Sequence, residues 1–146
     1  MPLKFRNLDV SPSDPVAKWG VEGILTAIDR GRLSDWRRIA REVVDDPWGP
    51  VARDLEEALE LAEDRGAVGA LREALAVARE RRSAEERESV AAELREIHGR
   101  SGMAQGEFAR RLGTSRTRVN TYLTGKVVPS AAFMVRARTF DQRPSP

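Results

Sequence analysis

The chain has 146 residues, of which 40% are hydrophobic and 33% charged, and this length fits one domain or two small ones. It has no cysteine and one histidine, His98, which excludes disulfides and thiolate zinc sites and argues against a Ser-His-Asp triad. No run approaches the ~20 uncharged apolar residues that a membrane span needs. The first ten residues are charged and lack the apolar core of a secretory signal. We therefore expect a soluble, cytoplasmic protein that is not an enzyme and uses no cofactor or metal.

The charge is distributed unevenly along the chain. Residues 1–66 carry a net charge of −4 and residues 67–99 a net charge of −1, whereas residues 100–146 carry +7. A basic end joined to an acidic body predicts that the basic end meets a polyanion. A disordered basic tail is the alternative, but this segment also has apolar residues at helical spacing, which favours a folded domain.

Residues 1–80 contain four runs of apolar residues at helical spacing, which predict a small N-terminal helical domain. Asp14 is expected to cap the first helix, Pro15 to be its first residue and Gly31 to end it. Ser34 is expected to cap the second helix. The inward faces of these two helices are predicted to contain Val16, Trp19, Gly23, Ile24, Ala27 and Ile28, and then Trp36, Ile39, Ala40, Val43 and Val44.

The third helix is expected to open at Pro50, after a break rich in turn-forming residues, and to end at Gly66. A fourth helix follows. The inward faces of these two helices are predicted to contain Val51, Leu55, Ala58, Leu59 and Ala62, and then Val68, Leu71, Ala74, Leu75 and Ala78.

Residues 81–89 are charged and are predicted to form a linker or helical connector. Ser83 and Glu86 have the spacing of a capping box. A new helix could therefore start here, or the segment could lie within one long helix from Val68 to His98. No run alternates between apolar and polar residues in the manner of a strand, so the predicted fold class is all-α.

Three tryptophans lie in the first 50 residues, namely Trp19, Trp36 and Trp48. We expect them to fill the core of the N-terminal domain. The alternative is a partner-binding surface, where exposed tryptophans act as hot spots. Trp48 is the one expected to be partly exposed, because prolines and glycine surround it. The N-terminal domain is accordingly predicted to serve in dimerisation or in partner binding.

The most informative segment is residues 105–124, which read QGEFARRLGTSRTRVNTYLT. Gly113 separates two short apolar helical faces, and Thr114 is expected to cap the second helix. A small residue, Ala109, suits two helices that cross closely. Val119, on the second helix, is expected to pack into the space between them. The spacing of alanine, glycine and valine is typical of a DNA-binding helix-turn-helix.

Residues 90–140, and most clearly 90–138, resemble the phage repressor and Cro-type helix-turn-helix domain, the XRE family. The matching text is VAAELREIHGRSGMAQGEFARRLGTSRTRVNTYLTGKVVPSAAFMVRAR. The resemblance implies a lambda-repressor-like domain with a first helix at Val90–His98, Leu94 and Ile97 facing inward. It implies a recognition helix at Thr114–Leu123 and a later helix, capped by Pro129-Ser130, with an inward face of Ala132, Phe133 and Val135.

Two residues depart from the family pattern. Ala104 stands where the family usually has a capping serine or threonine, which forfeits ~0.5–2 kcal/mol. Gly106 weakens the same helix by about 1 kcal/mol relative to alanine. Neither change touches the recognition helix. We expect residues 141–146 to form a loose tail.

The resemblance places the recognition helix in the major groove, with its N-terminal residues at the base edges. The best candidates for bidentate contacts are Arg116 to guanine and Asn120 to adenine. The predicted base contacts are Ser115, Arg116, Thr117, Asn120 and Thr121. The predicted phosphate contacts are Gln105, Arg110, Arg118, Thr124 and Lys126, together with the main chain near Thr124 and Gly125.

The predicted function is that of a sequence-specific transcriptional regulator, most simply a repressor that binds a two-fold operator in double-stranded DNA as a homodimer. The alternative is an antitoxin that binds its toxin through the N-terminal domain and represses its own operon. His98 is expected to be a residue of a helix C-terminus rather than a ligand or catalyst. The carboxylates of residues 45–46 and 56–57 are interpreted as solvated helix faces.

Overall fold

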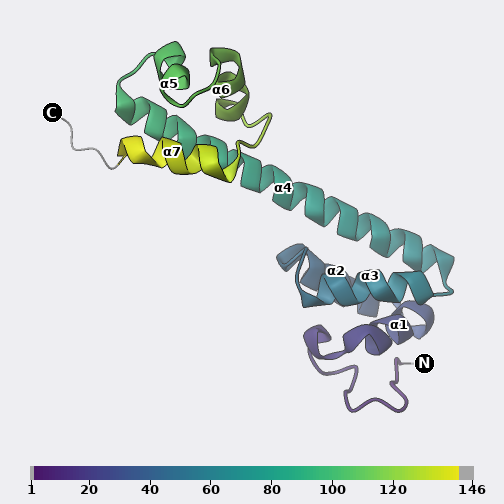
Figure 1. The fold of residues 1–146 in the computed structure, drawn as a ribbon. Helices are drawn as coiled ribbons and strands as arrows, with labels where there is room; N and C mark the ends of the chain where they lie inside the picture. The colour runs from purple at the N-terminus through teal and green to yellow at the C-terminus, as the bar shows by residue number, and fades with distance from the viewer. Residues whose placement is uncertain (1, 142–146) are drawn as a thin grey trace. The chain divides into compact units, whose positions relative to one another are not determined.

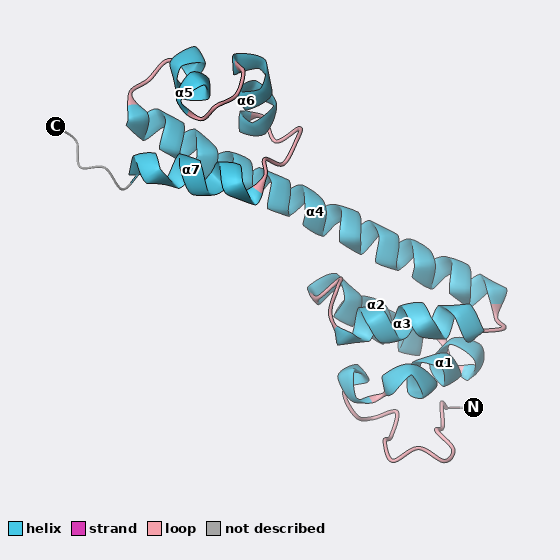
Figure 2. Cartoon of the chain, in the orientation of Figure 1, coloured by secondary structure: helices cyan, strands magenta, loops and turns pink. Residues whose placement is uncertain are grey.

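The computed structural model describes residues 2–141, and all regular secondary structure in that range is helical (Figures 1 and 2). The predicted all-α fold class is therefore confirmed. The chain divides into two compact units, which we call unit 1 (Met1–Arg82) and unit 2 (Ser83–Pro146). Residues 142–146 of the expected tail lie outside the described residues, and residue 141 ends a helix. The elements are the short 3-10 helix η1 (Val16–Lys18) and the α-helices α1 (Gly20–Arg30), α2 (Leu33–Asp45), α3 (Pro50–Leu61), α4 (Arg65–Ser101), α5 (Gln105–Arg111), α6 (Arg116–Leu123) and α7 (Ala131–Asp141).

Unit 1 is built around an apolar core to which η1, α1, α2, α3 and the first half of α4 contribute. Trp19 is almost completely buried, and its indole Nε1 donates to the carbonyl of Asp14 at 3.0 Å. Trp36 is partly buried and donates from Nε1 to the carbonyl of Ala27 at 2.8 Å. Both tryptophans therefore belong to the core, as predicted, and both have a partner for the indole N–H, which burial demands.

The predicted start of the first helix was wrong. Gly20 adopts a left-handed conformation (φ +68°), so the chain forms the 3-10 turn η1 before α1 begins. The carboxylate of Asp14 does not cap a helix but accepts from the backbone N–H of Ser11 at 2.8 Å. A positive φ is inexpensive for glycine and costly for other residues, so Gly20 sets this break.

The predicted cap of the second helix was also wrong. α2 begins at Leu33 with Arg32 as its N-cap, so Ser34 lies inside the first turn. The carboxylate of Asp35 accepts from the backbone N–H of Arg32 at 2.9 Å, which satisfies one of the donors left over at a helix start. On the predicted inward face Ile39 and Val43 are buried, but Val44 is exposed.

α3 begins at Pro50 as predicted, but it ends at Leu61 and not at Gly66. The carboxylate of Asp29, at the end of α1, accepts from the backbone N–H groups of Glu63 and Asp64, both at 2.9 Å. These bonds end α3 before the predicted position at Gly66. Asp64 in turn accepts from the N–H of Ala67 at 3.0 Å in the first turn of α4, so Gly66 lies within α4.

α4 is one continuous helix from Arg65 to Ser101, so Ser83 does not start a new one. Residues 70–98 contain neither glycine nor proline and are rich in alanine, glutamate and arginine, which favour helix. Leu71 and Leu75 are buried in unit 1, whereas Leu94 and Ile97 are buried in unit 2. Of the two arrangements that the sequence left open, the single long helix is the one observed.

The core of unit 2 is formed by buried side chains from the second half of α4 and from α5, α6 and α7. Ser130 caps α7, as predicted, by accepting from the N–H of Phe133 at 3.0 Å. The predicted inward face of α7 was only partly right, because Ala132 is exposed and Val135 is 61% exposed. The buried face consists of Phe133, Met134 and Ala137, which lie on one side of the helix. Relative to the prediction, the helix is rotated about its axis by one residue.

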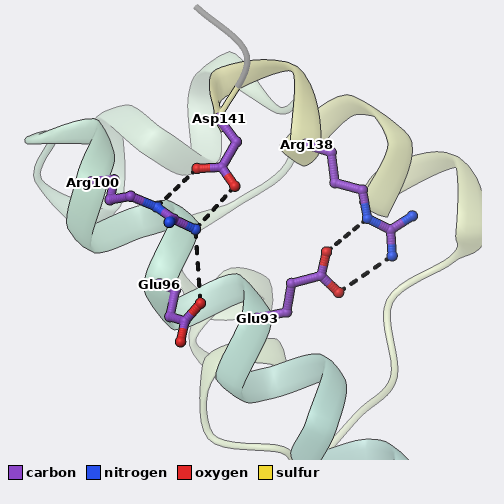
Figure 3. A network of polar contacts seen from close by, with 5 residues as sticks. All are labelled: Glu93, Glu96, Arg100, Arg138 and Asp141. Atoms are coloured by element: carbon purple, nitrogen blue, oxygen red, sulfur yellow. Dashed lines mark hydrogen bonds and ion pairs between the residues drawn. The ribbon is translucent and has the colours of Figure 1, made fainter. Parts of the chain in front are cut away.

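Ion pairs join α7 to α4 at two places (Figure 3). Arg138 donates from Nε to Oε1 of Glu93 at 2.7 Å and from Nη2 to Oε2 at 3.3 Å. Arg100 donates from Nε to Asp141 at 2.9 Å and lies 3.7 Å from Glu96. The hydrogen bonds from Arg138 lower the pKa of Glu93, and Glu93 raises the pKa of Arg138.

Arg95 of α4 holds the C-terminal end of α6. Its Nη1 donates to the carbonyl of Leu123 at 2.8 Å, and its Nη2 donates to Glu88 at 2.6 Å. The other carbonyls at this end of α6 accept from the backbone N–H groups of residues 124–127. A guanidinium at a helix C-terminus is also favoured by the helix dipole. Arg95 therefore links the first helix of unit 2 to α6.

We expect the Glu93→Gln variant to be less stable than the wild type at about pH 7, because the amide cannot form the charged pair with Arg138. The pKa of Glu93 lies below its usual 4.5, so the pair persists through pH 4.5 and is lost as the pH falls further. The measurement is the free energy of unfolding of both proteins in urea, at about pH 7 and about pH 3, with the NMR signals of Met134 as the reporter. A difference between the proteins that stays constant over this range would contradict it.

Replacement of Arg95 by methionine should destabilise unit 2 by ~0.5–1.5 kcal/mol, because the carbonyl of Leu123 loses its side-chain donor. The methionine keeps most of the aliphatic stem. Arg111→Met is the matched control, since within residues 2–141 the ion pair of Arg111 is with Glu107 of its own helix, at 3.4 Å. Equal destabilisation of the two variants in urea unfolding would show that Arg95 has no special role at α6.

Candidate nucleic-acid interface

α5 and α6 lie side by side in unit 2 (Figure 1). The tight turn that joins them contains Gly113. Gly113 is left-handed (φ +76°), a conformation in which a β-carbon is strained. The N–H of Thr114 returns to the carbonyl of Ala109 at 3.0 Å. Ala109 and Val119 are both buried in the core of unit 2. The predicted roles of the alanine, glycine and valine in this turn are therefore confirmed.

The cap of α6 is Ser115, not Thr114 as predicted. The Ser115 Oγ accepts from the backbone N–H of Arg118 at 3.1 Å, and α6 begins at Arg116. A one-residue shift of the cap leaves the inward face unchanged, because Val119 stays buried. The Ser115 hydroxyl still has its own proton to donate outward. At α5, Ala104 supplies no side-chain cap, as its residue type requires.

Opposite Val119, α6 presents a polar surface that we call the outer face of α6, consisting of Ser115, Arg116, Thr117, Asn120 and Thr121. All five are exposed except Thr121, which is half-buried. Arg116, Thr117 and Asn120 line a shallow hollow together with Gln105 of α5. Ser115, Thr117 and Thr121 border a second hollow with Arg118 and Val127. The structure thus brings the five residues predicted to read bases onto one surface.

The cationic side chains of unit 2 differ in whether a described acidic residue pairs with them. Those directed to acidic partners are Arg95, Arg100, Arg111 and Arg138. Within residues 2–141, no ion pair or side-chain hydrogen bond involves the guanidinium or ammonium groups of Arg110, Arg116, Arg118 and Lys126. These four are the cations that the sequence predicted for DNA contacts, and within the same range the guanidinium of Arg136 in α7, which the sequence did not assign, also has no such partner. Their charge is not neutralised by the described part of the chain, so it is available to an anion.

Two of the predicted contact residues use their hydroxyl protons within the helix. Thr121 donates from Oγ1 to the carbonyl of Arg118 at 2.6 Å. Thr124 donates from Oγ1 to the carbonyl of Asn120 at 2.8 Å, and its N–H bonds to the same carbonyl at 3.0 Å. Thr124 therefore has no free donor for a phosphate in this conformation. The oxygen of Thr121 can accept, and its methyl group can meet a thymine methyl.

The main-chain N–H groups expected to reach a phosphate after α6 are also engaged. The N–H of Gly125 bonds to the carbonyl of Tyr122 at 3.2 Å, and that of Lys126 to the carbonyl of Thr121 at 3.0 Å. These bonds close the C-terminal end of α6. The ammonium group of Lys126, which has no partner among the described residues, remains available for a phosphate contact.

Sequence reasoning missed one contact across the two helices. Gln105, the first residue of α5, donates from Nε2 to Oδ1 of Asn120 at 3.3 Å. Gln105 was assigned to a phosphate and Asn120 to a base, and nothing in their spacing indicates that they meet. The sequence gives one indication of this contact. Both residues carry a side-chain amide, and an amide can both donate to and accept from another amide.

His98 lies near the end of α4, as expected for a residue of a helix C-terminus. Its ring packs on Phe108 with centroids 4.9 Å apart, and its Nε2 is buried without a hydrogen-bond partner. In residues 2–141 no three acidic or histidine side chains gather in a metal-like cluster. Glu56, one of the carboxylates interpreted as a solvated face, is exposed as expected and also pairs with Arg79, whose hydrogen bond lowers the pKa of Glu56.

Residues 89–138 match the model of a family described as a helix-turn-helix domain. No curated protein matches the chain, and no solved structure matches it. No helix within the described residues is both long and apolar enough to cross a bilayer. Residues 89–138, which include the buried turn at Gly113 and the outer face of α6, therefore form a helix-turn-helix domain, and such a domain indicates a DNA-binding regulator.

Proposed function

We propose that the protein is a sequence-specific transcriptional regulator of the phage repressor and Cro type, and that it acts as a repressor. The observation that carries the proposal is the outer face of α6, a polar and cationic surface whose opposite side is locked by buried Val119. A helix of this kind enters the major groove of B-DNA, which is wide enough to admit it.

Arg116 and Asn120 are the proposed base readers. The guanidinium of Arg116 lies at the first turn of α6 with no ion pair among the described residues, and it suits the two acceptors of guanine. The amide of Asn120 suits the donor and acceptor of adenine. Thr117 and Thr121 are proposed to meet thymine methyl groups, and Ser115 to donate to a base or phosphate.

The proposed phosphate contacts flank this surface. Arg110 on α5, Arg118 on α6 and Lys126 in the following loop carry charges that no described residue neutralises. Such contacts fix the register of the protein on the duplex without reading its sequence. Thr124 would contribute only if its hydroxyl released the carbonyl of Asn120.

A single recognition helix buries too little surface for tight specific binding. We therefore propose a homodimer on a two-fold operator, with half-sites one turn of DNA apart. Unit 1 is proposed to supply either the dimer contact or a partner-binding surface. The direct test is selection of binding sequences by the full-length chain, followed by footprinting. Two protected half-sites with centres ~10–10.5 bp apart support the proposal, and a footprint without base preference contradicts it.

Replacement of Arg116 by alanine should cost ~1–3 kcal/mol on the selected operator and relax the base choice at one position. Lys126→Ala is the matched control, because a phosphate contact should weaken binding to every duplex and reduce the salt slope by about 1. Both effects are measured by titrating labelled duplexes at several salt concentrations. A uniform loss on all sequences for Arg116→Ala would argue against base reading.

A second candidate function is that of an antitoxin, and one observation in unit 1 favours it. Trp48 is 49% exposed, and the guanidinium of Arg79 lies 5.7 Å from the centre of its ring. Exposed tryptophans beside arginines are typical hot spots of protein interfaces. In this reading unit 1 binds a basic toxin while unit 2 binds the operator.

If unit 1 binds a toxin through this tryptophan, Trp48→Ala should weaken the complex by at least ~2 kcal/mol, the usual cost of truncating a hot spot. Operator binding should stay unchanged, because Trp48 lies outside unit 2. The measurement is titration calorimetry against the protein encoded by the adjacent gene. Val77→Ala, at another exposed apolar residue of unit 1, is the control. Equal affinities for both variants would remove Trp48 from the interface.

A further inference from the structure

A hollow beside the N-terminal segment of unit 1 is lined by three cations and by no acidic residue. We call it the basic hollow. It has a volume of about 260 Å³, and its lining residues are Pro2, Leu3, Lys4, Arg6 and Arg30. Residues 1–66 carry a net charge of −4, so a purely cationic lining does not follow from the composition of this part of the chain.

Two of the three cations are placed by the packing of their neighbours in the sequence. Leu3 and Phe5 pack against the core of unit 1, and Phe5 meets Trp19 edge-on with ring centroids 5.3 Å apart. Lys4 and Arg6 are exposed. In an alternating segment of this kind, side chains two residues apart point to the same side. The packing of Leu3 and Phe5 therefore directs Lys4 and Arg6 together to the outer side.

Arg30 brings the third charge from a different element. It is the last residue of α1, a helix that is held in the core by buried residues such as Ile24 and Ile28. Arg30 is exposed and lines the basic hollow together with Lys4 and Arg6. Two segments that are distant in the sequence thus bring their cations to one place, and the core of unit 1 holds both segments.

The described part of the chain does not compensate these charges. Within residues 2–141, no ion pair or side-chain hydrogen bond involves Lys4, Arg6 or Arg30. Like charges that line one hollow repel each other, and an anion bound between them relieves the repulsion. Guanidinium groups match the oxygens of phosphate in pairs, and an ammonium group binds phosphate as a point charge. Three positive charges suit a multiply charged phosphate better than a single carboxylate.

A second hollow of unit 1 shows the opposite arrangement. The groove between α3 and α4 is lined by three arginines and four acidic residues. Two of these arginines are paired across the groove, Arg72 with Glu60 at 3.3 Å and Arg79 with Glu56. Its charges are therefore largely balanced by the protein itself. The third arginine, Arg53, is exposed and has no partner among the described residues, so it provides a control for the cations of the basic hollow.

We propose that the basic hollow is a phosphate-binding site of unit 1, in which Lys4, Arg6 and Arg30 bind the phosphate oxygens. The phosphate can belong to the backbone of DNA or to a small phosphorylated compound, because both present the same kind of oxygen. The site lies outside the helix-turn-helix domain. The proposal therefore goes beyond the proposed function and does not depend on it.

The first experiment titrates the full-length chain with inorganic pyrophosphate at low salt, where the attraction between charges is least screened. The NMR signals of the backbone amides of residues 3–6 and of Arg30 should shift and saturate. The triple variant Lys4→Gln, Arg6→Gln, Arg30→Gln should lose this response, and each single replacement should weaken binding by roughly 3- to 10-fold, the usual net effect of one hydrogen bond. Arg53→Gln, the matched control, should bind as the wild type does.

Acetate at the same ionic strength separates phosphate binding from a general response to anions. An absence of saturable shifts in the wild type would overturn the inference. Equal shifts with acetate, or with the triple variant, would also overturn it. Circular dichroism and the emission of the tryptophans, all of which lie in unit 1, check that the triple variant is folded.

The second experiment identifies the source of the phosphate. Labelled duplex DNA is titrated with the wild type and the triple variant at several salt concentrations, and each lost phosphate contact should reduce the logarithmic salt slope by about 0.9. A reduced slope supports the site with the DNA backbone as its ligand. An unchanged slope, together with the pyrophosphate response, supports it with a small phosphorylated compound. If the wild type selects no DNA sequence, the proposed function fails, whereas the pyrophosphate titration still decides the phosphate site.

Discussion

The burial of Val119 against α5 is the contact on which the outer face of α6 depends. α6 has eight residues, too few to be a stable helix by itself in water. Its conformation therefore comes from packing, and the left-handed Gly113 is what brings α5 and α6 close enough to enclose the valine. With that side chain fixed inside, the helical period places Arg116 and Asn120 on the other side. The buried position of Val119 thus determines which residues of α6 face solvent.

Some arginines of unit 2 form ion pairs that join its helices, whereas others are exposed without such a partner among the described residues. Arg138 and Arg100 pair with carboxylates that join α7 and α4, and Arg95 holds the end of α6. Arg116 and Lys126 have no such partner among the described residues. A guanidinium that is paired with a carboxylate has part of its charge neutralised and some of its five N–H donors engaged, whereas an unpaired one offers all of them to a phosphate. The cations that stabilise unit 2 and the cations proposed to contact DNA are therefore different residues.

The sequence was sufficient for features set by local chemistry and insufficient for those set by distant partners. The all-α class, the start of α3 at Pro50, the turn at Gly113 and the cap of α7 at Ser130 all follow from residue type and spacing. The end of α3 does not, because it is set by a carboxylate of α1 that lies 34 residues earlier than the N–H it caps. The helical spacing of the apolar residues could not show by itself that α3 ends before Gly66.

The misplaced faces and caps have a related cause. In α7, alanines occur on several sides of the helix, so the pattern left its rotation open by one residue, and the fit of Phe133 and Met134 to the core decided it. At α6 both Thr114 and Ser115 are residue types that cap helices, and only the backbone shows which does so. The candidate DNA-contacting residues were identified individually from type and spacing, whereas the Gln105–Asn120 bond needs the crossing of two helices.

The aromatic residues are segregated between the units. All three tryptophans belong to unit 1, whereas the single tyrosine, Tyr122, lies in α6 and packs edge-on against Phe133 with ring centroids 5.0 Å apart. Indole emission from this protein thus originates wholly from unit 1, and the phenol absorbance originates wholly from the helix-turn-helix domain. The two halves of the molecule carry separate intrinsic chromophores, so melting of either can be followed optically without a label.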